Sequence, residues 1–282
     1  MRSAATVLLW VITTVLLAVA LPAAWVQMHI VDGAGYSGLA RQAAANPDLQ
    51  AAMAGELTAQ VGRLSASADS TVVGPISRAY TASSSFPAQF GQANAFAHRW
   101  LFTDTVDSDL DEQGRWVIDF APMLSDAAFT QTLSDYSITV PSAVPIPLTD
   151  GAPAALRPGA LRDVGMWWPW ATIGIGVLAA FSAALMLYAA PGRGKALAAL
   201  GVSAVLVGGA GWAAIEFGQR YLNHALNGTS GTIRTVADVM VATAQASMHQ
   251  WLTVTLIAGG GLVVVGVIVS LLSGLSRPVN AR

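Results

Sequence analysis

A short acidic run is the densest group of side chains in the sequence that could do chemistry. Within it, Asp107, Asp109 and Asp111 alternate in the way that the first three ligands of a calcium loop do. The pattern of an EF-hand then fails, because its sixth position is Glu112 instead of Gly and its twelfth is Ile118 instead of Glu. Two interpretations stay open: a weak calcium site at the three aspartates and, the favoured one, a solvated loop.

The remaining reactive residue types form no catalytic pattern. The sequence lacks a Gly-x-Ser-x-Gly elbow, and the turn Gly192–Lys195 lacks both the earlier Gly and the following Ser or Thr of a phosphate loop. His29, His224 and His249 are expected near one membrane surface, where a shared metal is a weaker interpretation than three isolated side chains. We therefore expect no cofactor and no enzymatic activity, with a membrane-embedded hydrolase as a minor alternative.

Composition places these residues in a membrane protein. Of the 282 residues 54% are hydrophobic and only 11% charged, whereas soluble domains carry about 25% charged residues. A helix needs about 20 mostly apolar residues to cross a bilayer. Four stretches without a charged side chain meet this requirement: about 5–27, 167–189, 196–215 and 250–273. The first is longer than the apolar part of a cleaved signal peptide, so we expect an uncleaved anchor.

Charge predicts the orientation of these spans. One set of short segments carries Arg2, Arg193, Lys195, Arg277 and Arg282 and no acid, whereas all sixteen acids lie in the other two segments. Since Lys and Arg in short loops mark the cytoplasmic side, both termini are expected there and the main domain outside. The expected location is the plasma (inner) membrane, in a multi-pass arrangement.

The segment between the first two spans is expected to form an extracytoplasmic domain. Helical spacing of apolar residues, interrupted at Asn46-Pro47, predicts two helices before a third at about 84–103. The third helix should bury one stripe: Phe86, Phe90, Ala93, Ala97 and Leu101.

Two short strands and a final long helix complete this expectation. We expect the strands at 115–120 and at Ser137–Val140, with a helix at 122–135 between them. Thr229 or Ser230 would cap a helix that continues into the last span.

The predicted class is thus a membrane α-helical protein with four transmembrane helices and a mainly helical α+β extracytoplasmic domain. The boundaries are an anchor helix at 1–28, the domain at 29–165, helix two at 166–190, a cytoplasmic turn at 191–195, helix three at 196–215, an extracytoplasmic helical hairpin at 216–249, helix four at 250–273 and a tail at 274–282.

Small residues recur along the predicted spans and allow helices to approach closely. They are Gly176, Ala180 and Ala184 in the second span, Ala204 and Gly208 in the third, and Gly259–Gly261 in the fourth. Packing within the bundle is the favoured interpretation, and packing onto a partner protein is the alternative. The spans contain no ionisable relay, which argues against a standalone pump.

The domain resembles one found in a family of actinobacterial multi-pass membrane proteins. The resemblance covers about residues 36–150 and rests on Ala44–Gln50, on Ser85–Arg99 and on Trp116–Leu124, which is similar to that family's V-x-L-D-L-x-P-L segment. These motifs are structural and imply no catalytic residues.

Size and topology are also similar to those of accessory subunits of Mce-type lipid importers in mycobacteria. The expected function is therefore a non-enzymatic accessory or scaffolding subunit of a cell-envelope complex, whose partners are other integral membrane proteins and the lipid bilayer, not nucleic acid. The alternative is an extracytoplasmic module that binds or senses a lipid or calcium.

Overall fold

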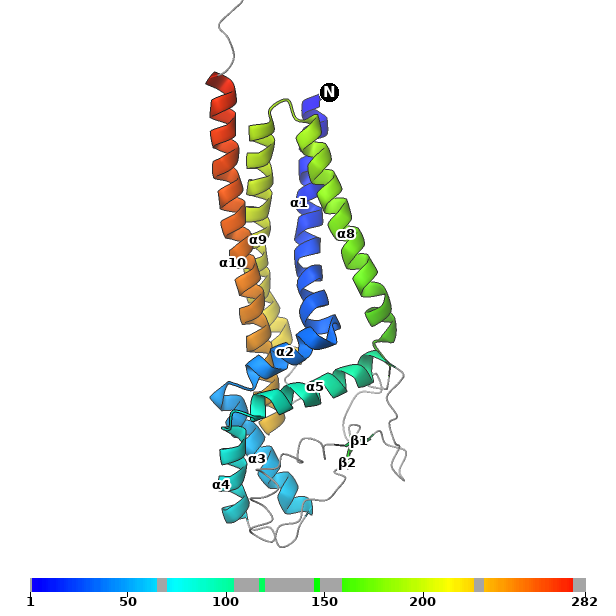
Figure 1. The fold of residues 1–282 in the computed structure, drawn as a ribbon, viewed down its shortest axis with the longest axis vertical. Coiled ribbons are helices and arrows are strands. Elements are labelled where there is room, and N and C mark those ends of the chain that lie inside the picture. Colours follow the sequence, from blue (N-terminus) through cyan, green and yellow to red (C-terminus); the bar gives the residue numbers. More distant parts are fainter. Residues whose placement is uncertain are drawn as a thin grey trace, which may run out of the picture. The chain divides into compact units, whose positions relative to one another are not determined.

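Four long apolar helices dominate the structure (Figure 1). The computed structural model describes residues 2–64, 70–103, 117–119, 145–147, 159–225 and 231–275. The helices and strands within these ranges are α1 (Arg2–Val26), the π-helix η1 (Gln27–Val31), α2 (Gly33–Ala43), α3 (Pro47–Leu64), α4 (Ser70–Thr81), α5 (Phe86–Phe102), β1 (Val117–Asp119), β2 (Pro145–Pro147), α8 (Arg162–Ala189), α9 (Arg193–Ala225) and α10 (Gly231–Leu275).

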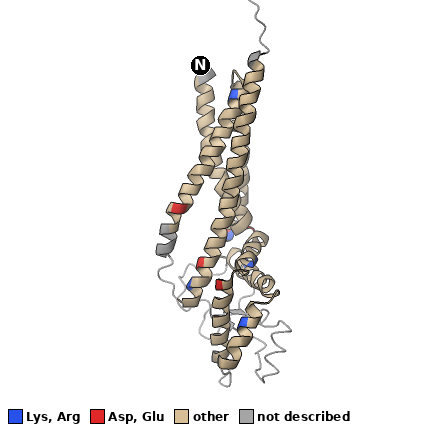
Figure 2. Cartoon of the chain, turned by 90° about the vertical axis from the view of Figure 1, so that its left-hand side faces the viewer, with Lys and Arg blue, Asp and Glu red and all other residues tan. Residues whose placement is uncertain are grey.

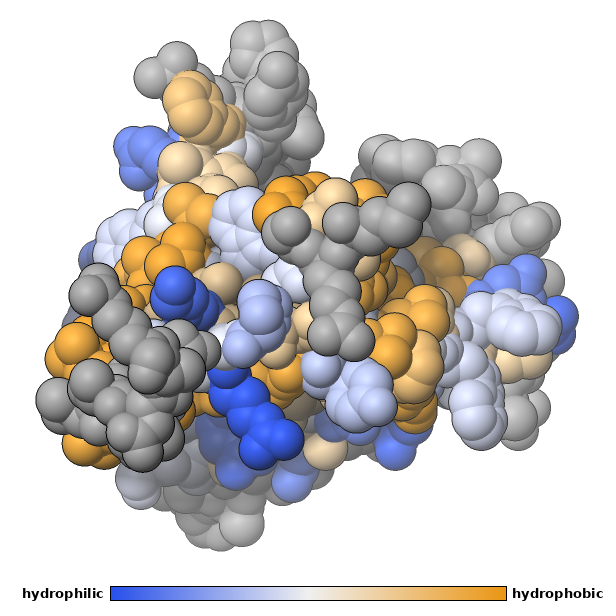
Figure 3. All heavy atoms as spheres, turned by 90° about the horizontal axis from the view of Figure 1, so that it is seen from above, coloured by the Kyte–Doolittle hydropathy of each residue, from blue (hydrophilic) through white to orange (hydrophobic). Residues whose placement is uncertain are grey.

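Each predicted span lies within one of the long helices. The segments long and apolar enough to cross a membrane are Ala4–Val31, Arg162–Ala189, Arg193–Gln219 and Gly231–Ser273. Figure 2 shows their apolar stretches almost free of charged residues, and seen end-on, apolar side chains reach the surface in several places (Figure 3). These four candidate spans indicate a multi-pass membrane protein.

The chain divides into two compact units. We call the first the bundle; it comprises Met1–Gln27, Trp168–Ala225 and Gln245–Arg282. The second unit comprises Met28–Trp167 and Leu226–Ala244. Helix α10 contributes to both, because its 45 residues run without interruption from Gly231 to Leu275.

A seam of glycines joins α9 and α10 in the bundle. A Cβ atom added to Gly201 would lie 2.6 Å from the Gly259 carbonyl oxygen, and one added to Gly266 would lie 2.4 Å from the Ala198 amide nitrogen. The two backbones are therefore in direct contact, as small residues permit in membranes. The seam glycines recur every seven residues, at Gly194, Gly201 and Gly208 on α9 and at Gly259 and Gly266 on α10.

Hydrogen bonds attach α1 to its neighbours within the bundle. Buried Thr13 bonds to Ser182 of α8 at 2.8 Å between the hydroxyl oxygens, and Thr14 bonds to Ser203 of α9 at the same distance. The indole Nε1 of Trp10 donates to the Ala199 carbonyl at 2.9 Å. Since these groups have no water to bond to inside a bilayer, their pairing fixes the rotation of α1 against α8 and α9.

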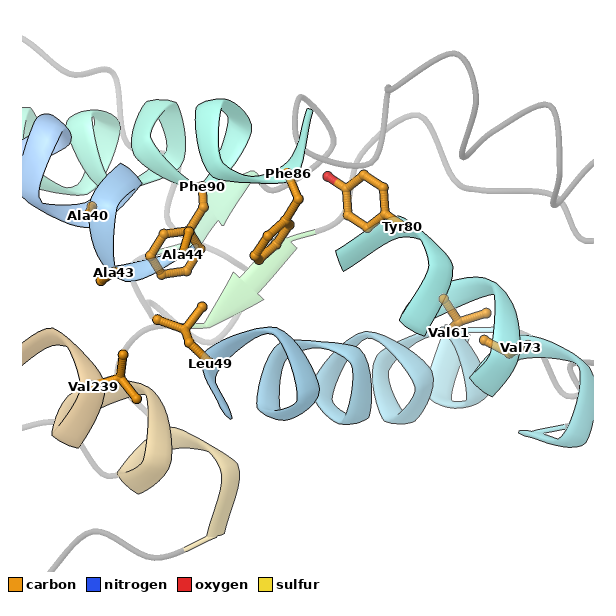
Figure 4. Packing of buried hydrophobic residues seen from close by; sticks show 10 residues of the cluster. All are labelled: Ala40, Ala43, Ala44, Leu49, Val61, Val73, Tyr80, Phe86, Phe90 and Val239. Carbon is orange, nitrogen blue, oxygen red and sulfur yellow. The ribbon is translucent and has the colours of Figure 1, made fainter. Parts of the chain in front are cut away.

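An apolar core holds the second unit together (Figure 4). Phe86 and Phe90 of α5 lie 5.8 Å apart between ring centroids and pack with Leu49 of α3. Small alanines on α2 leave room for these rings. Val239 of α10 is also part of the buried cluster. The core comprises Ala40, Ala43, Ala44, Leu49, Val61, Val73, Tyr80, Phe86, Phe90 and Val239.

The start of α3 lies where the sequence predicts it. Pro47 is its first residue, and the Asn46 side-chain oxygen accepts a hydrogen bond from the Asp48 amide at 2.8 Å. Proline at the first helical position and an Asx side chain before it are ordinary start signals. Helix α4, in contrast, was not expected; its buried Val73, Ser77 and Tyr80 face the core at helical spacing.

The predicted stripe on α5 is correct only in its first half. Phe86 and Phe90 are buried, whereas Ala93, Ala97 and Leu101 are half-buried. Gly91, His98 and Trp100 are buried instead. The reason is where α2 crosses α5. A Cβ on Gly91 would lie 3.0 Å from the Ser37 carbonyl, so α2 packs against the side of α5 that carries Gly91 and, seven residues later, His98.

The described part of the segment between the first two spans is helical apart from β1 and β2. These three-residue strands pair antiparallel, with Ile118 opposite Ile146. Strand β1 falls inside the segment predicted as a strand. The second predicted strand, Ser137–Val140, and the predicted helix at 122–135 lie outside the described residues.

We predict that Gly266→Leu destabilises the bundle by about 1–3 kcal/mol, the usual cost of overpacking, because the new Cβ would meet the backbone of Ala198. Thermal unfolding of the purified chain in a mild detergent measures the effect. Gly260→Leu is the matched control, since nothing lies within 4 Å of a Cβ at that position of the same helix. Equal loss of stability in both variants would rule out the seam as a packing determinant.

Candidate functional site

The structure places the residues predicted to do chemistry as follows. Asp107, Asp109 and Asp111 lie outside the described residues, as does the side chain of His224. The ring of His249 stacks on Trp212 at 4.1 Å between centroids. Among the residues that the structure describes, no group of three metal-ligating side chains comes together.

The predicted small-residue faces have two different surroundings. Gly208 is buried and Ala204 half-buried against α10, where a Cβ on Gly259 would lie 2.9 Å from the Ala204 Cβ. On α8, in contrast, Gly176, Ala180 and Ala184 are all exposed. The α9 stripe thus serves packing within the bundle, while described residues of this chain leave the α8 stripe uncovered.

The second unit contains a pocket of about 420 Å³ with a partly polar lining. Its walls come from the ends of four helical segments, η1, α2, α5 and α8. The lining residues are Val31, Gly33, His98, Arg99, Phe102, Thr103, Arg162, Gly165 and Met166. Sequence analysis did not single out this pocket.

The first wall is built where η1 turns into α2. The Asp32 carboxylate accepts a hydrogen bond from the Gly35 amide at 2.8 Å and so caps α2. A Cβ on Gly35 would lie only 1.7 Å from the Met28 carbonyl oxygen. Only glycine therefore lets the first turn of α2 fold back against the π-helix.

His98 connects this wall to α5. Its Nε2 lies 2.9 Å from the Ile30 carbonyl oxygen, and because a carbonyl only accepts, Nε2 carries the proton. The ring stacks on Phe102 at 4.2 Å and lies 5.3 Å from the Tyr36 ring, centroid to centroid. Burial raises the pKa of the Tyr36 phenol above its ordinary value of 10.0, which keeps this ring neutral.

The last wall joins the end of α5 to the start of α8. The Trp100 carbonyl accepts from the Gly159 amide at 3.0 Å, and the Leu101 carbonyl accepts from Leu161 at 2.9 Å. These bonds satisfy carbonyls that a helix end leaves without partners. Gly159 has φ of +68°, a left-handed turn that glycine adopts without strain, and α8 begins three residues later at Arg162.

Two guanidinium groups give the pocket a basic rim. Arg99 comes from α5 and Arg162 from α8, and both side chains are exposed. Among the described residues no carboxylate lines the pocket, although Asp163 lies 3.7 Å from Arg162 in an exposed ion pair. The apolar wall consists of Val31, Phe102 and Met166. Such a pocket can bind an anionic group beside an apolar one.

The four candidate spans indicate a multi-pass membrane protein, and the described residues of its second unit are mostly helical. Comparison with models of protein families, with curated proteins and with solved structures finds no match to this chain.

We predict that Gly35→Ala lowers the melting temperature of the full chain, because the added methyl group collides with the Met28 carbonyl. The measurement is thermal unfolding in detergent, followed by tryptophan fluorescence. Gly38→Ala is the matched control on the same helix, where nothing lies within 4 Å; it should be neutral or stabilising by up to about 1 kcal/mol. Unchanged stability of Gly35→Ala would contradict the tight junction.

Proposed function

We propose that the chain is a non-enzymatic accessory or scaffolding subunit of a larger membrane complex in the cell envelope. The observation that carries this proposal is the exposed stripe Gly176, Ala180 and Ala184 on α8. The interacting partners would be other integral membrane proteins, and the surrounding bilayer would cover the remaining apolar faces.

Helix α8 contacts the bundle through a narrow face. Its buried residues are Ala179, Ser182 and Met186, which follow one side of the helix. Nothing lies within 4 Å of a Cβ added to Gly176. Small residues let the backbones of two membrane helices come close together. A stripe that the described residues of this chain leave uncovered therefore suits a helix from a partner.

The proposed orientation places both termini in the cytoplasm and most of the second unit outside. It is supported by the five basic residues of the short segments, which include Arg193 and Lys195 in the first turn of α9. The resemblance of size and topology to accessory subunits of lipid importers names one class of complex in which to look for the partner. We also propose that the extracytoplasmic domain is a mainly helical α+β domain.

The pocket of the second unit favours a second candidate function, the binding or sensing of a ligand. A calcium site at the acidic run would be a different form of this function. Both are compatible with a subunit that takes part in no chemistry itself.

Engineered cysteines test the orientation, because the natural sequence contains none. We expect a membrane-impermeant maleimide to label Gln42→Cys in intact cells and to label Pro191→Cys only after the membrane is permeabilised. Both positions are exposed, and neither substitution changes a charge. The reverse pattern of labelling would overturn the proposed orientation.

Affinity purification in a gentle detergent, followed by mass spectrometry, tests the scaffold proposal. We expect the wild-type chain to bring down an integral membrane partner at fixed stoichiometry, and we expect Gly176→Leu to reduce that recovery at least about tenfold, because the side chain would hold the two helices apart.

Gly174→Leu is the matched control for this experiment. Gly174 is also an exposed glycine of α8 with nothing within 4 Å, and it lies about 200° around the helix from Gly176. Its recovery of the partner should equal that of the wild type. A wild-type chain that purifies alone, or a partner that Gly176→Leu retains in full, would contradict the proposal.

A further inference from the structure

The pocket of the second unit is built from the ends of two candidate membrane spans. Val31 is the last residue of the first span, and Arg162 is the first residue of the second. A span ends where the hydrocarbon core gives way to the headgroup layer. We therefore expect the lipid headgroup layer near the pocket residues Val31 and Arg162, on whichever membrane surface that is.

The charge of the rim selects the sign of a ligand. Arg99 and Arg162 reach the pocket from two different helices, and the lining residues that the structure describes include no carboxylate. The nearby Asp163 forms an exposed ion pair with Arg162, a kind of interaction that contributes little in water. Arginine is also the side chain whose planar fork matches the oxygens of a phosphate group.

The apolar wall selects an amphipathic ligand over a small inorganic anion. Phe102 and Val31 form part of the lining beside the two arginines. Met166, which also lines the pocket, is 54% exposed, and the following Trp167 is 68% exposed. Arg162, Met166 and Trp167 follow one another within the first two turns of α8, so a charged group and apolar groups are neighbours there as they are in a lipid.

We propose that this pocket binds the phosphate headgroup of an anionic phospholipid. Arg99 and Arg162 hold the phosphate oxygens, and the acyl chains lie along Phe102 and Met166. The inference deepens the second candidate function by naming its ligand class, and it does not depend on the scaffold proposal.

Binding of a short-chain fluorescent phosphatidylglycerol to the full chain tests the proposal. The chain is purified in a neutral detergent, and fluorescence anisotropy gives the dissociation constant. We expect the double variant Arg99→Gln/Arg162→Gln to bind roughly tenfold or more weakly, since charge-assisted hydrogen bonds are lost. Arg78→Gln removes an exposed arginine of the same unit outside the pocket and should bind as the wild type does.

Competition distinguishes a lipid from other sources of phosphate. Unlabelled phosphatidylglycerol should displace the probe, whereas phosphatidylcholine and inorganic phosphate should need concentrations at least about tenfold higher. Equal displacement by phosphatidylcholine would overturn the preference for an anionic lipid. Equal displacement by inorganic phosphate would overturn the lipid and indicate a site for free phosphate.

A second variant keeps the proposal testable if the arginine variants fold poorly. Met166→Glu places a carboxylate at the exposed edge of the pocket and leaves both arginines in place. It should therefore weaken binding of the anionic probe. The neutral control Met166→Gln should bind the probe more tightly than Met166→Glu does. Unchanged binding in Met166→Glu would overturn the proposal. The double arginine variant should still recover the partner protein at the wild-type level. That result would show that lipid binding and the scaffold function do not depend on each other.

Discussion

Contact between the backbones of α9 and α10 is the interaction on which the rest of the bundle depends. In a bilayer, apolar side chains gain little by leaving lipid for another helix, so association rests on close packing and polar bonds. Gly201 and Gly259 bring the two helices to the distance at which a single Cβ would collide. Toward the other end of the seam the contact changes in kind, because Leu252 and Leu256 fill the space above Gly208 and Gly211.

The polar side chains of α1 then decide how the remaining helices attach. Thr13 and Thr14 are adjacent in the sequence, yet they point to different neighbours, α8 and α9. Near the other end of α1, Trp25 donates to Ser247 of α10 at 3.2 Å and Trp168 of α8 donates to the Ala23 carbonyl at 3.3 Å. Helix α1 therefore bonds to every other helix of the bundle. Individual bonds of this kind contribute only about 0.6 kcal/mol on average, but together they specify one rotation of α1.

The second unit follows the rules of water-soluble proteins. Its helices bury apolar faces around Phe86 and Phe90, and exposed polar pairs such as Arg234 and Asp238 occupy the outside of α10. Helix α10 is amphipathic before about residue 245 and mainly apolar after it. The first part suits an aqueous environment and the second part suits lipid. The pocket forms where helix ends meet. Its lining side chains come from the η1–α2 junction, from the last turn of α5 and from the first turn of α8.

Much of this protein follows from local sequence alone. Length and apolarity determine the four long helices, since a span needs only an uninterrupted apolar stretch, and Asn46-Pro47 determines where α3 begins because both residues act on their own backbone. Tertiary structure decided what no local pattern contains. Which face of α5 is buried beyond Phe90 depends on the crossing of α2, and the role of each glycine depends on the helix opposite: Gly266 meets a backbone and Gly260 meets nothing, although both stand in the same apolar run. The pocket is the clearest case. Arg99 and Arg162 are far apart in the chain, and the hydrogen bonds from residues 159 and 161 to the end of α5 hold them at one rim.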